Sequence, residues 1–323
     1  MTTEHSTPFK RVPLYIALGL SVALVIATLI GAKIVYRKAA LQPVSMSTID
    51  SPDADSPGCS RFLDALPREL AGHPRAELTD PAPAGAAAWR SNSVSRITLR
   101  CGVSLPLQYT TLSETTDVDG TDWIRVDDAT TGSSLRTWFA VNRTPVVAVT
   151  ADDRALDGAG APVAELSGAL DTLDRTDPAP APAPLSELGR GTSDQGCDKL
   201  LPSLPEKLSG AAGYIRIEDD RISAAGLPAG SAAWTAPGAE PVVLRCGVAE
   251  APSYEPGVQV QQVNDIAWYR DTTLANGTTA GTWYALGRTA NVAVSMPQAA
   301  GNTAIVGLGD AISRNIPGAP GAR

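Results

Sequence analysis

The chain has 323 residues, 43% of them hydrophobic, and a formal net charge of −8. This hydrophobic content is enough to build folded cores, and the length is typical of about two domains. An acidic chain repels polyanions, which excludes nucleic acids and anionic wall polymers as partners bound through charge. We therefore expect folded, acidic domains without a nucleic-acid partner.

The first predicted element is a membrane-spanning helix at residues 12–36, after a short cytoplasmic segment at residues 1–11. No charged side chain occurs in residues 12–32, and the apolar run continues beyond Lys33. About 20 apolar residues cross a hydrocarbon core. A cleaved signal peptide typically has a shorter core of about 7–15 residues, followed by small residues at the cleavage site. The sequence favours an uncleaved single-pass anchor, with a cleaved signal as the alternative.

The side of the membrane on which the remaining chain lies is indicated by the cysteines. Basic residues flank the apolar run on both sides, namely Lys10, Arg11, Lys33, Arg37 and Lys38. They do not decide the orientation, because long domains translocate largely regardless of flanking charge. All 4 cysteines follow the apolar run, and disulfides need an oxidising compartment. We expect a cell-membrane protein whose C-terminal domains are extracytoplasmic.

The rest of the chain is a tandem duplication. The sequence Leu-Arg-Cys-Gly-Val at residues 99–103 recurs at residues 244–248, 145 positions later. The same offset relates Trp89 to Trp234, Trp123 to Trp268, Trp138 to Trp283 and Arg143 to Arg288. We predict a spacer at 37–58, repeat domain 1 at 59–174, a Pro/Ala-rich linker at 175–196, repeat domain 2 at 197–317 and a disordered tail at 318–323.

Each repeat is predicted to be an α+β domain of helix, antiparallel sheet and helix. Leu63, Leu66 and Leu70 follow helical spacing, and closing helices are expected at residues 163–173 and 303–312. Asp-Gly at residue 119 and Asn-Gly at residue 276 predict hairpin turns, which join antiparallel strands. Strands are expected at residues 97–103, 123–128, 137–143, 146–150 and 258–263.

Four cysteines can pair in three ways. The duplication favours Cys59 with Cys101 and Cys197 with Cys246, because each pair then joins helix to sheet within one repeat. Crossed pairs would instead bind the repeats together. Metal binding or redox chemistry is the alternative, although no Cys-x-x-Cys motif and no neighbouring His supports it.

No catalytic set is recognised. The chain has 2 His, of which His5 precedes the apolar run and His73 has no counterpart in repeat 2. A nucleophile–His set or a His-ligated zinc in a duplicated domain needs a matched His. Acidic residues seldom match either, and Asp122 corresponds to Ala267. We expect no catalytic residue, metal or cofactor. An envelope enzyme that uses carboxylates of one repeat is the alternative.

Matched aromatic and basic residues form a candidate binding face. Its residues are Trp123, Arg125, Arg143, Trp268, Arg270 and Arg288. Trp123 and Arg125 are two positions apart and share one face of a strand. In one interpretation the tryptophans stack on a sugar or peptide while the arginines hold a carboxylate. In the other, which is the more ordinary arrangement, the tryptophans are core and the arginines stack or pair beside them.

Together these motifs resemble the actinobacterial family called domain of unknown function 3515. Repeat 2 carries nearly all of the family pattern: Cys197, Leu204-Pro205, Trp234, residues 244–248, Trp268 and Gly287-Arg288. It departs from that pattern at Ala267, where the family has Asp. Repeat 1 carries most of it but has Asn142 in place of Gly. Because the family has no established activity, the resemblance implies location and fold.

We expect from this sequence a non-catalytic binding or scaffolding module of the cell envelope. The partner would be a cell-wall component or a membrane protein. Two copies of one domain on one chain favour this hypothesis, because two weak sites gain avidity.

Overall fold

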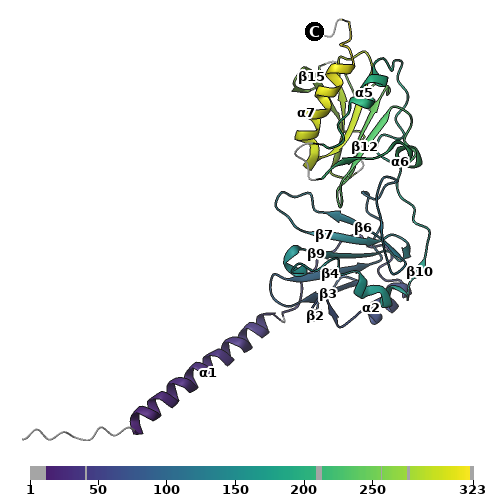
Figure 1. Ribbon diagram of the computed structural model, residues 1–323. Helices are drawn as coiled ribbons and strands as arrows, with labels where there is room; N and C mark the ends of the chain where they lie inside the picture. Colours follow the sequence, from purple (N-terminus) through teal and green to yellow (C-terminus); the bar gives the residue numbers. More distant parts are fainter. Residues whose placement is uncertain (1–11, 41, 209–212, 256, 275–276, 321–323) are drawn as a thin grey trace, which may run out of the picture.

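The computed structural model describes residues 12–40, 42–208, 213–255, 257–274 and 277–320. The expected cytoplasmic segment at residues 1–11, residues 321–323 of the expected tail and Asn276 of an expected hairpin turn lie outside these ranges. Figure 1 shows a long helix followed by two lobes, each built on an antiparallel sheet with helices packed against it.

The long helix α1 (Val12–Ala40) extends away from the two lobes (Figure 1). Its stretch Tyr15–Val35 has a mean hydropathy of 2.3 and is 0% buried. By length and composition it can cross a membrane, a property that a signal sequence near the N-terminus shares.

Repeat 1 contains an 8-stranded antiparallel sheet in the order β1-β2-β3-β4-β9-β7-β6-β5. Its strands are β1 (Glu69–Leu70), β2 (His73–Ala76), β3 (Ala86–Arg90), β4 (Arg96–Cys101), β5 (Thr116–Val118), β6 (Thr121–Asp127), β7 (Arg136–Ala140) and β9 (Val147–Ala151). A separate pair joins β8 (Arg143–Thr144) to β10 (Asp174–Arg175). The helical segments are α2 (Pro57–Ala65), α3 (Asp153–Leu156), the 3-10 turn η1 (Ala164–Leu166) and α4 (Ser167–Leu170).

Repeat 2 contains a 7-stranded antiparallel sheet in the order β11-β12-β13-β17-β16-β15-β14. Its strands are β11 (Ile215–Arg216), β12 (Ser231–Thr235), β13 (Val242–Cys246), β14 (Gln261–Val263), β15 (Ile266–Asp271), β16 (Ala280–Ala285) and β17 (Val292–Pro297). Its helices are α5 (Cys197–Ser203), α6 (Asp219–Ala224) and α7 (Gln298–Asn315). From β12 onward the strand order repeats that of β3 onward, so the α+β fold class is confirmed.

Each half contains one disulfide, as predicted from the sequence. Cys59 of α2 is bonded to Cys101 of β4, and Cys197 of α5 is bonded to Cys246 of β13. Both bonds therefore join a first helix to the sheet beside it. With partners 42 and 49 positions apart in the sequence, the chain-entropy estimate gives about 4 kcal/mol for each.

A matched tryptophan fastens the end of each first helix to the sheet. Trp89 and Trp234 are both fully buried, on β3 and β12. Their Nε1 groups donate to the carbonyls of Pro67 and Pro205, at 3.0 and 2.8 Å. The Leu-Pro block and the first tryptophan of each repeat thus form one structural unit, because the indole body fills the core while its N–H finds a partner.

The closing helices differ between the repeats. In repeat 2, α7 (Gln298–Asn315) runs beyond the expected residues 303–312 at both ends. In repeat 1 the closing helix expected at residues 163–173 is shorter than predicted: the contiguous η1 and α4 cover residues 164–170. Asp157, with φ of 44°, and Gly158, with φ of 80°, break the helix that α3 begins.

Candidate functional site

The Arg of each Leu-Arg-Cys-Gly-Val motif holds an extended segment against the sheet face opposite the helices. In repeat 1, Nη2 of Arg100 donates to the carbonyl of Ser47, which follows α1. In repeat 2, Nη1 of Arg245 donates to the carbonyls of Leu185 and Leu188 in the linker, at 2.6 and 2.8 Å. Burial lowers the pKa of both guanidinium groups. Each of these arginines therefore fixes the segment that precedes its repeat to the sheet.

The Gly of the same motif permits that segment to approach closely. Gly102 has φ of 84°, and a Cβ there would lie 2.3 Å from the backbone nitrogen of Ala54. The carbonyls of Gly102 and Gly247 accept hydrogen bonds from the backbone N–H groups of Asp53 and Gly191, at 3.1 and 2.8 Å. Positive φ and close backbone contact are what glycine allows at low cost, so this motif serves the fold.

Arg143 and Arg288 fasten matched hairpin turns. Arg143 is 2% exposed, and it donates to Oγ1 of Thr121 at 2.9 Å and to the carbonyl of Gly120 at 3.3 Å. In repeat 2, Nη2 of Arg288 donates to the carbonyl of Asp265 at 3.2 Å. Asp265 occupies the position that Gly120 has in repeat 1. The late arginine of each repeat is thus bonded within its own domain.

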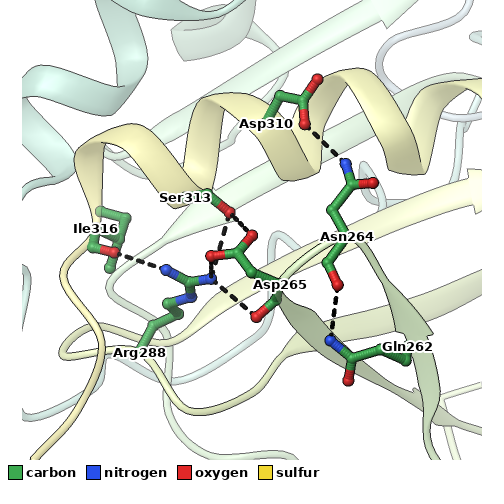
Figure 2. Close-up of polar contacts among 7 residues, drawn as sticks. All are labelled: Gln262, Asn264, Asp265, Arg288, Asp310, Ser313 and Ile316. Carbon is green, nitrogen blue, oxygen red and sulfur yellow. Dashed lines mark hydrogen bonds and ion pairs between the residues drawn. The ribbon is translucent and has the colours of Figure 1, made fainter.

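Figure 2 shows how repeat 2 extends this contact to α7. The Asp265 carboxylate pairs with Nη2 of Arg288 at 2.6 Å and accepts a hydrogen bond from Ser313 of α7. Nη1 of Arg288 donates to the carbonyl of Ile316 at 3.3 Å, and the Asn264 amide donates to Asp310 at 2.7 Å. The hydrogen bond from Ser313 and then that from Arg288 lower the pKa of Asp265. The cluster binds the β14–β15 turn to α7.

The remaining candidate residues do not form one exposed face. Trp123 and Trp268 are 2% and 0% exposed and belong to the cores of their repeats. Arg270 lies over the ring of Trp283, with its Cζ 5.8 Å from the ring centre. This burial agrees with the second interpretation of these residues, in which the tryptophans are core, since neither tryptophan presents a ring to solvent. The physical reason is that both side chains point to the sheet face that the helices cover.

Arg125 lies elsewhere, at a contact between the repeats. Its Nε pairs with Asp127 at 2.8 Å, and its Nη2 donates to the carbonyl of Pro237 at 2.9 Å. The backbone N–H of Asp127 donates to the carbonyl of Gly238 at 2.7 Å. The loop between β12 and β13 thus reaches across to the end of β6, which sequence spacing alone does not predict.

A second contact joins the repeats through an apolar side chain. Leu112 of repeat 1 is 2% exposed and packs with Ile222 and Val243 of repeat 2. Close by, Oγ1 of Thr111 donates to the carbonyl of Ala225 at 2.7 Å, and Glu114 pairs with Arg221 at 2.7 Å. Apolar burial together with directed polar bonds holds the two repeats as neighbours.

The Pro/Ala-rich linker is docked to both repeats. The backbone N–H of Ala181 donates to the carbonyl of Tyr109, and the carbonyl of Ala181 accepts from the N–H of Thr111, both at 2.9 Å. Ala183 belongs to the same apolar cluster as Leu112, and Leu185 accepts the hydrogen bond from Arg245. The segment is extended, as its composition predicts, but it is fixed along its length.

Between these contacts lies a cavity of about 300 Å³ with walls from both repeats. Trp123, Arg125 and Trp138 line it from the sheet of repeat 1, while Ala161 lines it from the interrupted closing segment. Pro237 lines it from the β12–β13 loop of repeat 2. Nε1 of Trp123 is buried and has no hydrogen-bond partner among the described residues. A cavity between packed units with a few polar groups is the usual form of a small-ligand site.

The break in the closing helix of repeat 1 borders this cavity. Residues 153–170 and 298–315 occupy equivalent positions at the offset of 145. In α7, Ala304 and Ile305 are buried against the sheet. Their counterparts, Ala159 and Gly160, are exposed. Repeat 1 therefore lacks one covering turn of helix that repeat 2 possesses.

The fold and the contacts define a tandem α+β protein with a composite cavity and an apolar N-terminal helix. Comparison with family models matches residues 18–178 and 173–321 to the family described as "Protein of unknown function (DUF3515)". The chain belongs to this family and carries two copies of its domain, which confirms the resemblance seen in the sequence. No curated protein and no solved structure matches the chain.

The sequence analysis selected Trp123 and Arg125 as part of a face within one repeat, whereas in the structure they line a cavity between the two repeats. Their cavity depends on the β12–β13 loop of repeat 2, about 110 positions away, and on the broken closing helix. The sequence does contain one signal for this break. Gly158, Gly160 and Pro162 lie close together in the closing segment of repeat 1, whereas α7 contains no proline, and this composition favours an interrupted helix in repeat 1.

Proposed function

We propose that α1 anchors the protein in a cell membrane and that the two repeats form one non-catalytic binding module of the cell envelope. The composite cavity carries this proposal, because both repeats build its walls and its volume of about 300 Å³ lies within the range of small-ligand sites. The length and hydropathy of α1 support the anchor. The two disulfides support an extracytoplasmic position.

The docked linker changes how the two copies would act. Two independent sites on a flexible tether gain affinity through avidity. Here the contacts of Leu112, Thr111 and Arg125 join the repeats directly. We therefore propose one shared site instead of two separate ones, with a cell-wall component or a membrane protein as the source of its ligand.

Topology is tested with the full chain fused at its C-terminus to alkaline phosphatase, which is active only after export. We expect activity in the membrane fraction, and no activity when residues 12–36 are deleted. The intact mass of the membrane-bound protein, 33.4 kDa without the fusion, separates an anchor from a cleaved signal. An inactive but stable fusion contradicts the extracytoplasmic position.

Binding is tested with the full chain in detergent, immobilised and exposed separately to cell-wall and membrane fractions. The matched control is Ala161→Leu, which enlarges a side chain on the cavity wall. We expect retention of a component by the native chain and loss of that retention in the variant. Equal retention by both proteins places binding outside the cavity and contradicts the proposal.

The enzyme alternative gains no specific support from this site. Among the residues that line the cavity, Glu114 is the sole carboxylate, and it is paired with Arg221. General acid–base chemistry with carboxylates uses two groups whose environments separate their pKa values.

A further inference from the structure

Four arginines gather in the half of repeat 1 that α1 enters. Arg96, Arg100 and Arg154 line a groove of about 870 Å³, whose floor is the sheet face opposite the helices. Arg90 of β3 lies directly opposite Arg96 of β4. None of the four forms an ion pair with any residue that the structure describes. These four residues define a basic groove.

The pair of Arg90 and Arg96 has an energetic cost within the protein. The Cβ atoms of directly opposite residues in an antiparallel pair lie about 4.5–5.5 Å apart, and like charges there destabilise the sheet. Arg90 donates to the carbonyls of Asn92 at 3.1 Å and Gln42 at 2.6 Å, which fix its side chain without neutralising its charge. An anion held between the two guanidinium groups would remove the repulsion.

Two carboxylates line the same groove, those of Asp50 and Asp152. Asp152 is the N-cap of α3 and accepts from the backbone N–H of Ala155 at 2.9 Å. The neighbouring Asp153 is neutralised by its ion pair with Arg136 at 2.8 Å. Four guanidinium groups against two carboxylates leave a local charge of 4 − 2 = +2, in a chain whose net charge is −8.

Repeat 2 has no equivalent of this charge. The positions of three of the arginines carry uncharged residues there, at the offset of 145: Thr235, Pro241 and Ala299. The fourth, Arg100, corresponds to Arg245, which is buried and bonded to the linker. The same fold therefore forms without the other three, which occur only in the repeat that follows α1.

The chain between α1 and the basic groove is short. From Val35, where the apolar stretch ends, five further residues of α1 rise about 7.5 Å and two more reach Gln42 within about 7 Å. The carbonyl of Gln42 bonds Arg90. Headgroups extend about 5–8 Å beyond the hydrocarbon core. Arg90 therefore lies within about one Debye length of the headgroups of a membrane that α1 spans.

Exposed apolar side chains accompany the arginines. Val94, in the turn between β3 and β4, is 54% exposed, and Ile49, in the segment after α1, is 52% exposed. Both line the groove. Basic residues beside exposed apolar ones are the composition of a surface that lies against anionic lipids. Figure 1 shows that α1 reaches repeat 1 on the side away from repeat 2, where such contact is possible.

Resting on the membrane anchor proposed above, we propose that the basic groove binds the anionic headgroup of a phospholipid in the membrane that α1 spans. A guanidinium group donates two parallel hydrogen bonds to phosphate oxygens. A long polyanion would also meet the acidic remainder of the chain, whereas a headgroup is one small anion. The anchor keeps such headgroups beside the groove at a high effective concentration.

The test uses the full chain in nanodiscs of dioleoyl-phosphatidylcholine with a rising fraction of dioleoyl-phosphatidylglycerol. All 4 cysteines are in disulfides, so Ser93→Cys supplies a single thiol for an environment-sensitive fluorophore. Ser93 is exposed at the rim of the groove. We expect the emission to shift to the blue and to saturate as the anionic lipid increases. The shift should shrink at high salt.

Paired variants give the quantitative prediction. Arg96→Gln with Arg154→Gln should raise the half-maximal fraction of phosphatidylglycerol about tenfold or more, because each basic residue at an anionic surface contributes a factor of about five. Arg61→Gln with Arg314→Gln removes the same charge from exposed residues elsewhere and should stay within twofold. Arg96→Lys with Arg154→Lys should keep most of the response, which separates loss of charge from a damaged fold.

Three outcomes overturn the headgroup site. Equal responses of the two glutamine pairs mean that the groove does not hold the lipid. A full shift in phosphatidylcholine alone means apolar contact without recognition of charge. Loss of the shift with inorganic phosphate, but not with chloride at equal ionic strength, means that the groove takes free phosphate. A chain that does not enter phosphatidylcholine nanodiscs contradicts the anchor itself, so the two proposals fail in different ways.

Discussion

Repeat 1 and repeat 2 share a sheet but are closed differently. In repeat 2, the 18-residue helix α7 covers the sheet without a break, and the cluster of Asp265, Arg288 and Ser313 ties it to the β14–β15 turn. In repeat 1 the equivalent residues form α3, an irregular segment, η1 and α4. The comparison teaches that features matched between the repeats maintain the fold, whereas the unmatched closing segment is where a ligand site has room to form.

Loss of the matched tryptophan should have the largest effect. Trp89→Ala and Trp234→Ala each remove a fully buried indole and its bond to a prolyl carbonyl. We expect each to lower the free energy of unfolding by about 3–5 kcal/mol. Urea unfolding of the full chain in detergent measures this. Unequal losses, beyond about 1.5 kcal/mol, would contradict equivalent structural roles for the pair.

Substitutions at equivalent positions of the two closing segments should change the free energy of unfolding by unequal amounts. Ile305→Ala removes a side chain of α7 that is buried against the sheet, so we expect a loss of about 2–5 kcal/mol. Its counterpart, Gly160, is exposed, and a Cβ there meets no atom within 4 Å. Gly160→Ala should therefore change stability by less than about 1 kcal/mol. Similar effects at the two positions in the same unfolding assay would remove the asymmetry on which the cavity depends.

The late arginines should differ in their response to salt. Arg143→Met removes both hydrogen bonds to the Thr121 hydroxyl and one of two donors to the Gly120 carbonyl, and Arg288→Met removes an ion pair with Asp265. We expect losses of about 1–3 kcal/mol for each. Salt screens the exposed carboxylate of Asp265, so the loss at Arg288 should shrink at high ionic strength. The loss at Arg143, whose bonds go to neutral acceptors, should remain constant, and a parallel decline would refute this distinction.

Most of the fold could be predicted because its signals are local or duplicated. The Asp119-Gly120 turn is an example: both residues have positive φ, at 52° and 73°, as a two-residue hairpin requires. One disulfide in each half follows from the duplication, because a self-contained unit needs its own pair. The spacing of residues along the chain is therefore sufficient to predict both features.

The candidate site could not be predicted in the same way. That Trp123 and Arg125 share a strand face was visible in the sequence, but the sheet face that the helices cover was not. The cavity further requires Pro237, which comes from a loop of the other repeat. A contact between units depends on how they dock, and no periodicity within either unit encodes that docking.

The smallest expected effect is a loss of stability at acidic pH, which we expect in repeat 2 and not in repeat 1. Hydrogen bonds from Ser313 and Arg288 lower the pKa of Asp265 from its ordinary value of 3.8, whereas repeat 1 has Gly120 at that position. A carboxyl with a depressed pKa stabilises the fold above its unfolded pKa, and this contribution disappears as pH falls through the folded value. The native chain should therefore lose a small increment of stability below about pH 4 that Asp265→Asn lacks.

Because Asp265 is largely exposed, solvent screening keeps the increment small. Ser313→Ala should reduce it without removing the carboxylate, since the Ser313 hydroxyl is the larger cause of the shift. Hydrogen exchange in α7 between pH 3 and pH 5 reports the difference locally. If Asp265→Asn and the native chain lose protection in α7 together as pH falls, the carboxylate does not hold the turn to this helix, and the closed state of repeat 2 rests on apolar packing alone.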